Sequence, residues 1–348
     1  MKTKFVTFAV LALAILAMSG CSSQTGPRHS TSQPMTTPAG MIEYLDCVPA
    51  LQNAQVWQNS YSDGLILNTE HYKVYTTLLD PLMLRQVPAF LESAHREYQK
   101  QTPATLETHS PFVIYLFKDR EQWENFTKEF TGKQSDLYLK IQRGAYYLNG
   151  ACVAYNIGRS RTFSVLGHEG WHQFNSRHFT YRLPSWLDEG LATLFEESSY
   201  INNRFVFRPN QNLGRLGSLR KTLIDENAIP LKTLLALNPG EVVHYQDSED
   251  VMAFYAQAYA LVRFLREDNY GQRYAQFQNL LSDAIEGTWP LSQDEQKIAS
   301  NRNIPFTTSW NRYVSPKLFN QYIEGEIGLL QKDYSRFCRK IVYNIRLK

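Results

Sequence analysis

Two histidines and a glutamate near the middle of the chain form the pattern most able to do chemistry. Residues 168–172 read His-Glu-Gly-Trp-His, which is the H-E-x-x-H pattern. In a helix, His168 and His172 lie one turn apart on one face and can bind a single ion. Neutral imidazoles suit Zn²⁺, and a catalytic zinc takes three protein ligands and leaves one position for water. The pattern therefore predicts one Zn²⁺ per chain, with Glu169 as the general base of a hydrolytic reaction.

The third zinc ligand is expected from a second helix that faces the first. Ser185 and Asp188 have the S-x-x-D spacing of a capping box, which predicts a helix that begins at Trp186. This interpretation gives Asp188 a role at the helix start and leaves Glu189 free to bind the metal. Small residues such as Gly190 would let the two helices approach closely.

These segments resemble the gluzincin clan of zinc metallopeptidases. The resemblance rests on H-E-G-W-H at 168–172 and L-P-S-W-L-D-E-G-L-A-T-L-F at 183–195, and it is greatest for the peptidase-MA-like group, often labelled DUF1570. It is strong over residues 163–197 and looser over 71–264. The resemblance implies a thermolysin-like catalytic lobe with a small mixed sheet, and it makes Glu189 the third ligand. Many relatives support a ligand histidine with an acidic residue four positions later. This chain has Thr193 there, so Glu196 or Glu197 is the candidate substitute.

Other interpretations of the histidines stay open. The H-E-x-x-H pattern also fits an amphipathic core helix whose histidines make ordinary hydrogen bonds. His178 is an alternative third ligand, although solvent exposure is the expectation for it. His71, His95 and His109 lack the spacing of metal ligands and are expected at the surface or in the core.

A tyrosine far along the chain is a candidate catalytic residue. Residues 254–265 are amphipathic and place Tyr255 and Tyr259 one helical turn apart. The segment resembles the Y-A-Q-x-x-x-L-V-x-F-L stretch of the same peptidase-like group, and Tyr255 matches the position of the transition-state tyrosine in gluzincin aminopeptidases. Its phenol could donate a hydrogen bond to a developing oxyanion. The alternative is packing with a solvated hydroxyl, which we expect for Tyr259 in particular.

A β-hairpin is expected just before the zinc helix. Residues 145–148 and 151–155 flank Asn149-Gly150, the favoured two-residue turn. The resemblance implies that the strand leading into the zinc helix is a sheet edge on which an extended peptide binds. An ordinary sheet hairpin is the alternative.

The hydrophobic periodicity predicts an α+β fold. Before and including the zinc helix, the expected elements are a strand at 71–77, a helix at 81–100, a strand at 112–117, and helices at 121–130 and 162–175. Beyond Glu197, a short strand is expected at 204–207 and helices at 213–223, 231–237, 251–266, 270–284 and 317–342. We therefore expect an α/β catalytic lobe over residues 41–200 and a mainly helical lobe over residues 201–348.

The N-terminal segment resembles a bacterial lipoprotein signal. Lys2 and Lys4 precede an apolar run that ends in Leu-Ala-Met-Ser-Gly-Cys21. Residues 1–20 would be removed, Cys21 would be lipidated, and residues 21–40, rich in Ser, Thr, Gln, Pro and Gly, would form a flexible tether. Ser22 follows the cysteine, which favours the outer membrane, with the body facing the periplasm. An ordinary secretory signal or an uncleaved anchor is the alternative.

Charge and cysteine content narrow the possible partners. The formal net charge falls from +3 to +1 when Lys2 and Lys4 are removed, so there is no electrostatic reason to expect nucleic-acid binding. Cys47, Cys152 and Cys338 allow at most one disulfide, and the sequence does not choose the pair. None has the C-x-x-C spacing of a cysteine zinc site.

These patterns together predict a lipid-anchored periplasmic zinc metallopeptidase that acts on a peptide or protein. The sequence lacks the G-x-M-E-N-type motif with which aminopeptidases of this clan hold a substrate amine, which favours an endopeptidase. A non-catalytic envelope lipoprotein that binds or assembles other components is the alternative, and Thr193 is the residue that supports it. Amide cleavage in cell-wall peptides is a third possibility, and the oligomeric state stays open.

Overall fold

A mixed six-stranded sheet forms the first half of the protein. The computed structural model describes residues 36–141, 144–238, 248–302 and 307–343. The strand order is β1-β2-β3-β4-β6-β5; β3 and β6 run parallel to β4, and the remaining pairs are antiparallel. The strands are β1 (Asn53–Val56), β2 (Leu65–Asn68), β3 (Tyr72–Thr76), β4 (Phe112–Phe117), β5 (Ala145–Leu148) and β6 (Ala151–Tyr155). The protein is therefore mixed α/β, as the periodicity predicts.

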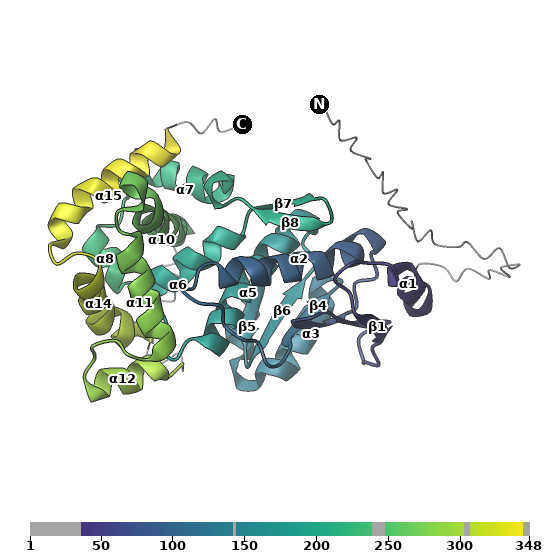
Figure 1. Cartoon of the computed structure of the whole chain (residues 1–348). Helices are drawn as coiled ribbons and strands as arrows, with labels where there is room; N and C mark the ends of the chain where they lie inside the picture. Colours follow the sequence, from purple (N-terminus) through teal and green to yellow (C-terminus); the bar gives the residue numbers. More distant parts are fainter. Residues whose placement is uncertain (1–35, 142–143, 239–247, 303–306, 344–348) are drawn as a thin grey trace, which may run out of the picture. The chain divides into compact units, whose positions relative to one another are not determined.

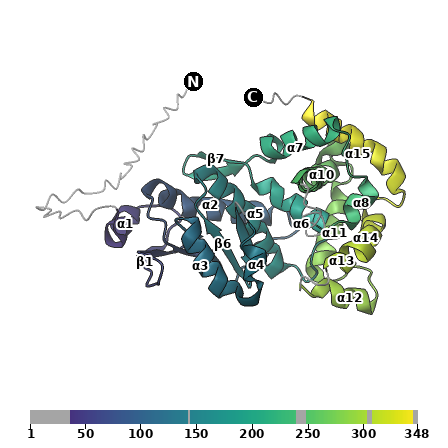
Figure 2. The same ribbon diagram turned by 180° about the vertical axis from the view of Figure 1, so that it is seen from behind.

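Helices cover both faces of this sheet. The larger core lies between one face and the helices α2 (Pro81–Gln99) and α5 (Arg159–His178). The helices α3 (Arg120–Thr131) and α4 (Ser135–Tyr138) lie on the other face (Figure 2). They enclose a smaller, aromatic core in which Trp123 packs on Tyr146 and Tyr155. Since both faces are covered, all five residues of the inner strand β6 are buried.

The predicted hairpin places β5 at an edge of the sheet. Asn149 and Gly150 have φ values of 50° and 81°, as a two-residue turn between antiparallel strands requires. β5 pairs with β6 on one side only, and it lies next to α5 in space. Among the described residues, the other side of the β5 backbone is not paired within the sheet.

Two glycines let α5 approach Phe195 and Tyr98 closely. A Cβ on Gly167 would collide with the backbone oxygen of Phe195, and one on Gly170 would collide with the hydroxyl of Tyr98. The Tyr98 hydroxyl donates to the carbonyl of Gly167 at 2.7 Å. His168 and His172 instead line a cavity.

A short helix, α6 (Ser185–Ala192), and a second hairpin follow α5. The hairpin pairs β7 (Ser198–Ile201) with β8 (Arg204–Phe207) through a turn at Asn202 and Asn203, both with positive φ. Its partner strand β7 is not among the elements expected from the sequence. α6 packs against α5 and, through Gly190, against the backbone oxygen of Ala258 on α10 (Ser248–Glu267).

The remaining residues are mainly helical, and α10 is their central element. Most of its side chains from Ala253 to Leu265 are buried, and it packs on α6 and α7 (Figure 1). Four helices of this half contact it: α7 (Leu213–Ile224), α8 (Leu231–Ala236), α11 (Tyr274–Glu286) and α15 (Ile327–Val342). The others are α12 (Gln293–Ser300), α13 (Thr307–Ser309), a π-helical turn (Trp310–Val314) and α14 (Ser315–Tyr322), and α12, α13 and α14 all pack against the π-helical turn.

Three expectations about element boundaries are wrong. The single helix expected at 317–342 is two helices, α14 and α15, separated at residues 323–326. The helix expected from Tyr270 begins at Tyr274, because Tyr270 has a φ of 59° and is fully exposed. The end of the expected tether is helical, since α1 (Pro38–Leu45) is capped by the Thr37 hydroxyl.

The three described cysteines are not joined in disulfides. Cys152 and Cys338 are buried, Cys47 is exposed, and all three are free thiols. Among the residues that the structure describes, none of the helices combines the length and apolar character needed to cross a bilayer. The signal segment, Cys21 and most of the predicted tether lie outside the described residues.

Candidate metal centre

The structure brings His168, His172 and Glu189 together. Glu189 Oε2 lies 3.2 Å from His168 Nε2 and 3.6 Å from His172 Nε2, and one donor atom of each residue lies within 4.8 Å of the other two. Donors bound to one tetrahedral zinc at about 2.0–2.2 Å lie roughly 3.3–3.6 Å apart. The two imidazoles come from one turn of α5 and the carboxylate from α6, so the donor set and its spacing fit a zinc ion.

Asp188 orients the ring of His172. Its Oδ1 lies 3.0 Å from His172 Nδ1 and accepts hydrogen bonds from Trp171 Nε1 at 3.1 Å and Asn175 Nδ2 at 2.6 Å. When Nδ1 carries the proton, Nε2 presents its lone pair toward Glu189. Asp188 is thus an outer partner of a candidate ligand.

The capping box expected at Ser185 and Asp188 is therefore wrong. α6 begins at Ser185 rather than at Trp186, and no side chain caps it. The Ser185 hydroxyl accepts from Asn311 Nδ2 at 2.7 Å, while the Asp188 carboxylate faces α5. The spacing matches a capping box, but both side chains hydrogen-bond to residues of other elements instead of capping α6.

Glu196 orients the ring of His168. Its Oε1 lies 2.9 Å from His168 Nδ1, and its Oε2 accepts from Asn212 Nδ2 and Arg215 Nε, both at 2.8 Å. Thr193 does not take this role, since it is buried and donates to the Gly190 carbonyl at 2.6 Å. Of the two substitutes expected for Thr193, Glu196 makes the contact with the ligand histidine.

Charge at this centre favours a cation. Burial alone would raise the pKa of Glu189, but the adjacent His172 and His168 hold it far below its usual range. Burial likewise opposes ionisation of Glu196, yet Arg215 and His168 lower its pKa to about 2. Ionised carboxylates surrounding two imidazoles attract a divalent cation to their shared centre.

Glu169 lies beside the ligands and remains outside the ligand group. Burial raises its pKa, although His172 and His168 oppose the shift. Its side chain lines both of the large cavities described below. A carboxylate next to a metal centre can accept a proton from an attacking water and release it again to a leaving group.

The two tyrosines of α10 have different environments. The Tyr255 ring lies 6.2 Å from the His168 ring, and the Arg215 guanidinium lies 5.0 Å from its centroid. Tyr259 is buried among core residues, where it receives a hydrogen bond from Arg263 Nη1 at 2.9 Å. Tyr255 therefore faces the metal centre, and Tyr259 packs in the helical core.

Two cavities meet at the metal centre. Each has a volume of about 590 Å³, and both are lined by Ala145, His168, Glu169 and Tyr255. The first cavity extends past Tyr146 and Tyr147 to Arg182, Arg302 and Trp310. The second extends past Arg161 and Ser164 to Glu197, Arg215 and Met252. A chain bound across the centre would have space on both sides.

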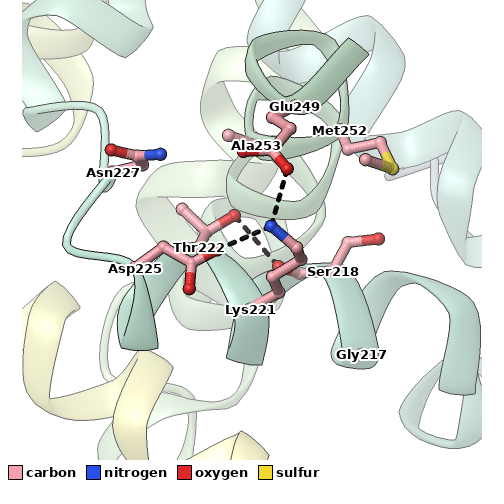
Figure 3. Close-up of a pocket in the computed structure, with 9 residues that line it drawn as sticks. All are labelled: Gly217, Ser218, Lys221, Thr222, Asp225, Asn227, Glu249, Met252 and Ala253. Atoms are coloured by element: carbon pink, nitrogen blue, oxygen red, sulfur yellow. Dashed lines mark hydrogen bonds and ion pairs between the residues drawn. The ribbon is translucent and has the colours of Figure 1, made fainter.

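A smaller cavity of about 220 Å³ lies between α7 and α10. It shares Ser218 and Met252 with the second cavity. The Lys221 ammonium pairs with Asp225 at 2.6 Å and with Glu249 at 2.8 Å (Figure 3). The charged groups of this cavity therefore link α7 to α10 and do not belong to the metal centre.

His71 and His95 lie apart from the metal centre and contact each other. His71 stacks on His95 with ring centroids 3.8 Å apart, and its Nδ1 lies 2.7 Å from Glu92 Oε2. Glu70, His71 and Glu92 form a second close group of potential ligands, but Glu92 also accepts from the Thr69 hydroxyl and the His71 backbone. The Glu92 carboxylate therefore accepts hydrogen bonds from the residues just before β3.

The expectation of solvent exposure for His178 is wrong. The residue is half-buried, its ring packs on Phe174, and its Nε2 lies 3.3 Å from the Thr108 hydroxyl. His178 is the last residue of α5, and it contributes to the core rather than to the ligand set.

The sequence did not indicate four residues that line the cavities at the metal centre: Arg182, Asn212, Arg215 and Arg302. They come from three segments that only the fold brings together: the start of α7, the connection between α5 and α6, and the residues after α12. Compared with known proteins, the chain matches no protein-family model, no curated protein and no solved structure.

Proposed function

We propose that this protein is a zinc-dependent metallopeptidase of the gluzincin type. The convergence of two Nε2 atoms and one carboxylate oxygen supports this most directly, since each imidazole is also held at Nδ1 by a separate carboxylate. Such carboxylate–histidine pairs are typical of metal sites. A sheet whose edge strand lies next to the H-E-x-x-H helix is the arrangement that the family resemblance implies, and it adds support.

His168, His172 and Glu189 would hold the metal. When bound there, Zn²⁺ makes hydroxide available near neutral pH and polarises a substrate carbonyl. Asp188 and Glu196 fix the two rings and keep their protons on Nδ1, so that Nε2 stays available as a ligand.

Glu169 and Tyr255 supply the remaining chemistry. Glu169 takes the proton of the attacking water on a carboxylate oxygen and later transfers it to the leaving amine. Burial raises the pKa of Tyr255 well above its ordinary value, with a further contribution from Glu189, so its hydroxyl stays protonated. That hydroxyl donates a hydrogen bond to the oxygen on which negative charge develops.

The substrate would be an extended peptide. The side of β5 that is not paired among the described residues can hydrogen-bond to a peptide backbone, and such backbone bonds require little of the peptide's sequence. Ala145, the first residue of β5, lines both cavities beside the metal centre. Because space continues on both sides of the centre, cleavage inside a chain fits this cleft better than removal of one terminal residue.

Metal analysis combined with Glu169→Gln tests the proposal. The wild-type protein should bind one zinc and cleave an unbiased peptide library, and removing zinc with a chelator should abolish cleavage. Glu169→Gln should still bind one zinc but lose at least about a hundredfold in kcat, the low end for general base catalysis. Stoichiometric zinc without cleavage, or cleavage that persists after metal removal, contradicts the proposal.

The alternative of a non-catalytic binding lipoprotein loses its specific support. It rested on Thr193 standing where an acidic residue is expected. Glu196 reaches His168 Nδ1 from three residues further along and does what that acidic residue would do. The remaining groups of a hydrolytic centre are also present together.

We also propose that the protein is attached to the bacterial envelope through a lipid on Cys21 and faces the periplasm, with the outer membrane as the favoured location. The support is the sequence of residues 1–21. Mass spectrometry of the mature N-terminus should find an acylated cysteine, and Cys21→Ser should release the protein from membranes. A mature N-terminus elsewhere contradicts the proposal.

A further inference from the structure

The last described helix, α15, carries its positive charge on one side. Lys332, Arg336, Arg339 and Lys340 follow an i, i+4, i+7, i+8 spacing, which places them on one face of a helix. All four are exposed. Asp333 is the one acidic residue within the bounds of this helix. The outward side of α15 is therefore a basic face.

The apolar side of α15 is covered by the protein itself. The helix packs on α7, α8 and α10, and it lies at the margin of the helical half in both views (Figures 1 and 2). The Tyr334 hydroxyl donates to the carbonyl oxygen of Gln257 on α10 at 2.8 Å. The buried residues are Leu330, Tyr334, Phe337, Cys338 and Val342. This packing fixes which side faces outward, so the basic face stays at the surface of the folded protein.

The charge of the basic face is partly compensated. Arg336 pairs with Asp333 at 2.5 Å, and Asp333 also lies 3.5 Å from Arg273. Within the described part of the chain, the other three cations of the face take part in no ion pair. They are exposed and hydrated, so the face is not strained. Its importance is that a body with a formal charge of only +1 presents several cations side by side.

Two exposed apolar side chains share the basic face. Leu329 and Tyr343 lie seven positions before and after Arg336, which places all three on one side of the helix. Leu329 is 67% exposed and Tyr343 is 86% exposed. Cations interleaved with leucine and tyrosine suit the surface of a membrane, where phosphate groups lie beside an apolar layer and tyrosine is enriched.

We propose that the basic face of α15 binds an anionic membrane surface. Its cations contact the phosphates of the lipid headgroups, and Leu329 and Tyr343 contact the apolar layer just below them. Because the apolar side of α15 is covered, the helix lies on the membrane and does not insert. This contact goes beyond the proposed peptidase and the lipid on Cys21, and it would set how the body is oriented at the membrane.

Vesicle sedimentation of a chain without lipid tests the proposal. The mature chain with Cys21→Ser is mixed with vesicles of equal parts phosphatidylglycerol and phosphatidylcholine, or of phosphatidylcholine alone, in 0.1 M salt. Each lysine or arginine near an anionic surface strengthens binding about fivefold, so three unpaired cations should favour the anionic vesicles on the order of a hundredfold. In 1 M salt the screening length falls from about 10 Å to about 3 Å, and most of this preference should disappear.

Variants with the same change in net charge locate the effect. Replacing two cations of the basic face, Arg339→Gln with Lys340→Gln, should weaken binding to anionic vesicles roughly 25-fold. The matched control, Lys128→Gln with Lys133→Gln, removes two exposed cations outside α15 and should bind within about twofold of the parent chain. A thermal melt of each variant shows that the folded state is being compared.

The outcomes separate this inference from the earlier proposals. Equal binding to both kinds of vesicle, or an equal loss in the two double variants, overturns the membrane contact, even if Cys21 is acylated and the protein cleaves peptides. Salt-sensitive binding that depends on Arg339 and Lys340 supports the contact, whatever the state of Cys21. In the membrane-release test of Cys21→Ser, a high-salt wash removes the contribution of the basic face.

Discussion

Replacing Glu196 by Gln isolates the role of the carboxylate that holds His168. The Glu196 carboxylate lies 2.9 Å from His168 Nδ1 and pairs with Arg215. Glutamine keeps the shape and one acceptor but removes the charge. Loss of such an outer partner lowers metal affinity about 10–100-fold, or roughly 1.4–2.7 kcal/mol. Because Asp188 still holds His172, we expect a loss near tenfold for Glu196→Gln.

The assay is a zinc titration in competition with a chromophoric chelator, at neutral pH. Removing one partner of a buried ion pair costs up to about 3–5 kcal/mol in stability. Arg215 is partly exposed and the Gln oxygen can still accept from it, so a smaller loss is expected. Urea unfolding of the metal-free variant shows that the affinity is measured on folded protein.

Thr193→Val is the matched control. Thr193 occupies the position at which the family resemblance expects the acidic residue, but its hydroxyl donates to the Gly190 carbonyl instead. We expect zinc affinity within about twofold of the wild type for this variant. Wild-type affinity in Glu196→Gln, or an equal loss in both variants, would refute the role assigned to Glu196.

Three further predictions concern packing, acid stability and thiol reactivity. Gly190→Ala should cost about 1–3 kcal/mol in urea unfolding and weaken zinc binding, because its Cβ would lie 2.6 Å from the Ala258 carbonyl oxygen of α10; an unchanged unfolding midpoint contradicts this close approach. Burial and the neighbouring His71 lower the pKa of His95 to about 4, against about 6.5 in the unfolded chain. Between these pH values the unfolded state binds more protons than the folded state, so the free energy of unfolding falls as the pH drops from about 6.5 to 4. The loss is at most about 3 kcal/mol, and urea unfolding of His95→Gln should show a correspondingly flatter pH dependence. A thiol reagent should modify only Cys47 in the native protein and all three described cysteines after denaturation, whereas rapid modification of a second thiol would contradict their burial.

The sequence alone was informative where a few residues fix the chemistry locally. The i, i+4 spacing places His168 and His172 on one side of a helix whatever surrounds it. The Asn149-Gly150 pair specifies a turn, and alternating or periodic apolar residues specify the strands and helices that flank it. These features predict four of the six strands of the sheet and the histidine pair, whereas β1 and β2 were not expected. The choice of Glu189 as third ligand followed from the family resemblance.

The partners of those residues were harder to predict because they depend on tertiary contacts. Asp188 matched a capping box, yet the nearness of α5 gives its carboxylate a stronger set of donors in His172, Trp171 and Asn175. Arg215 reaches Glu196 from a helix that begins well after α6. Arg182 and Arg302 stand alone in connecting segments, so no spacing or period marks them.

All three candidate ligands come from residues 168–196, and so do the two carboxylates that lie within hydrogen-bonding distance of the ligand histidines. Within this stretch, α5 packs on the sheet and α6 packs on α5 and α10, and the contacts that form the site join residues 16 to 28 positions apart. Loss of the ion should therefore increase local opening of residues 168–196 first, while the sheet and the C-terminal helices keep their structure. Hydrogen exchange with and without a chelator would show faster exchange confined to α5, α6 and the turn that follows them.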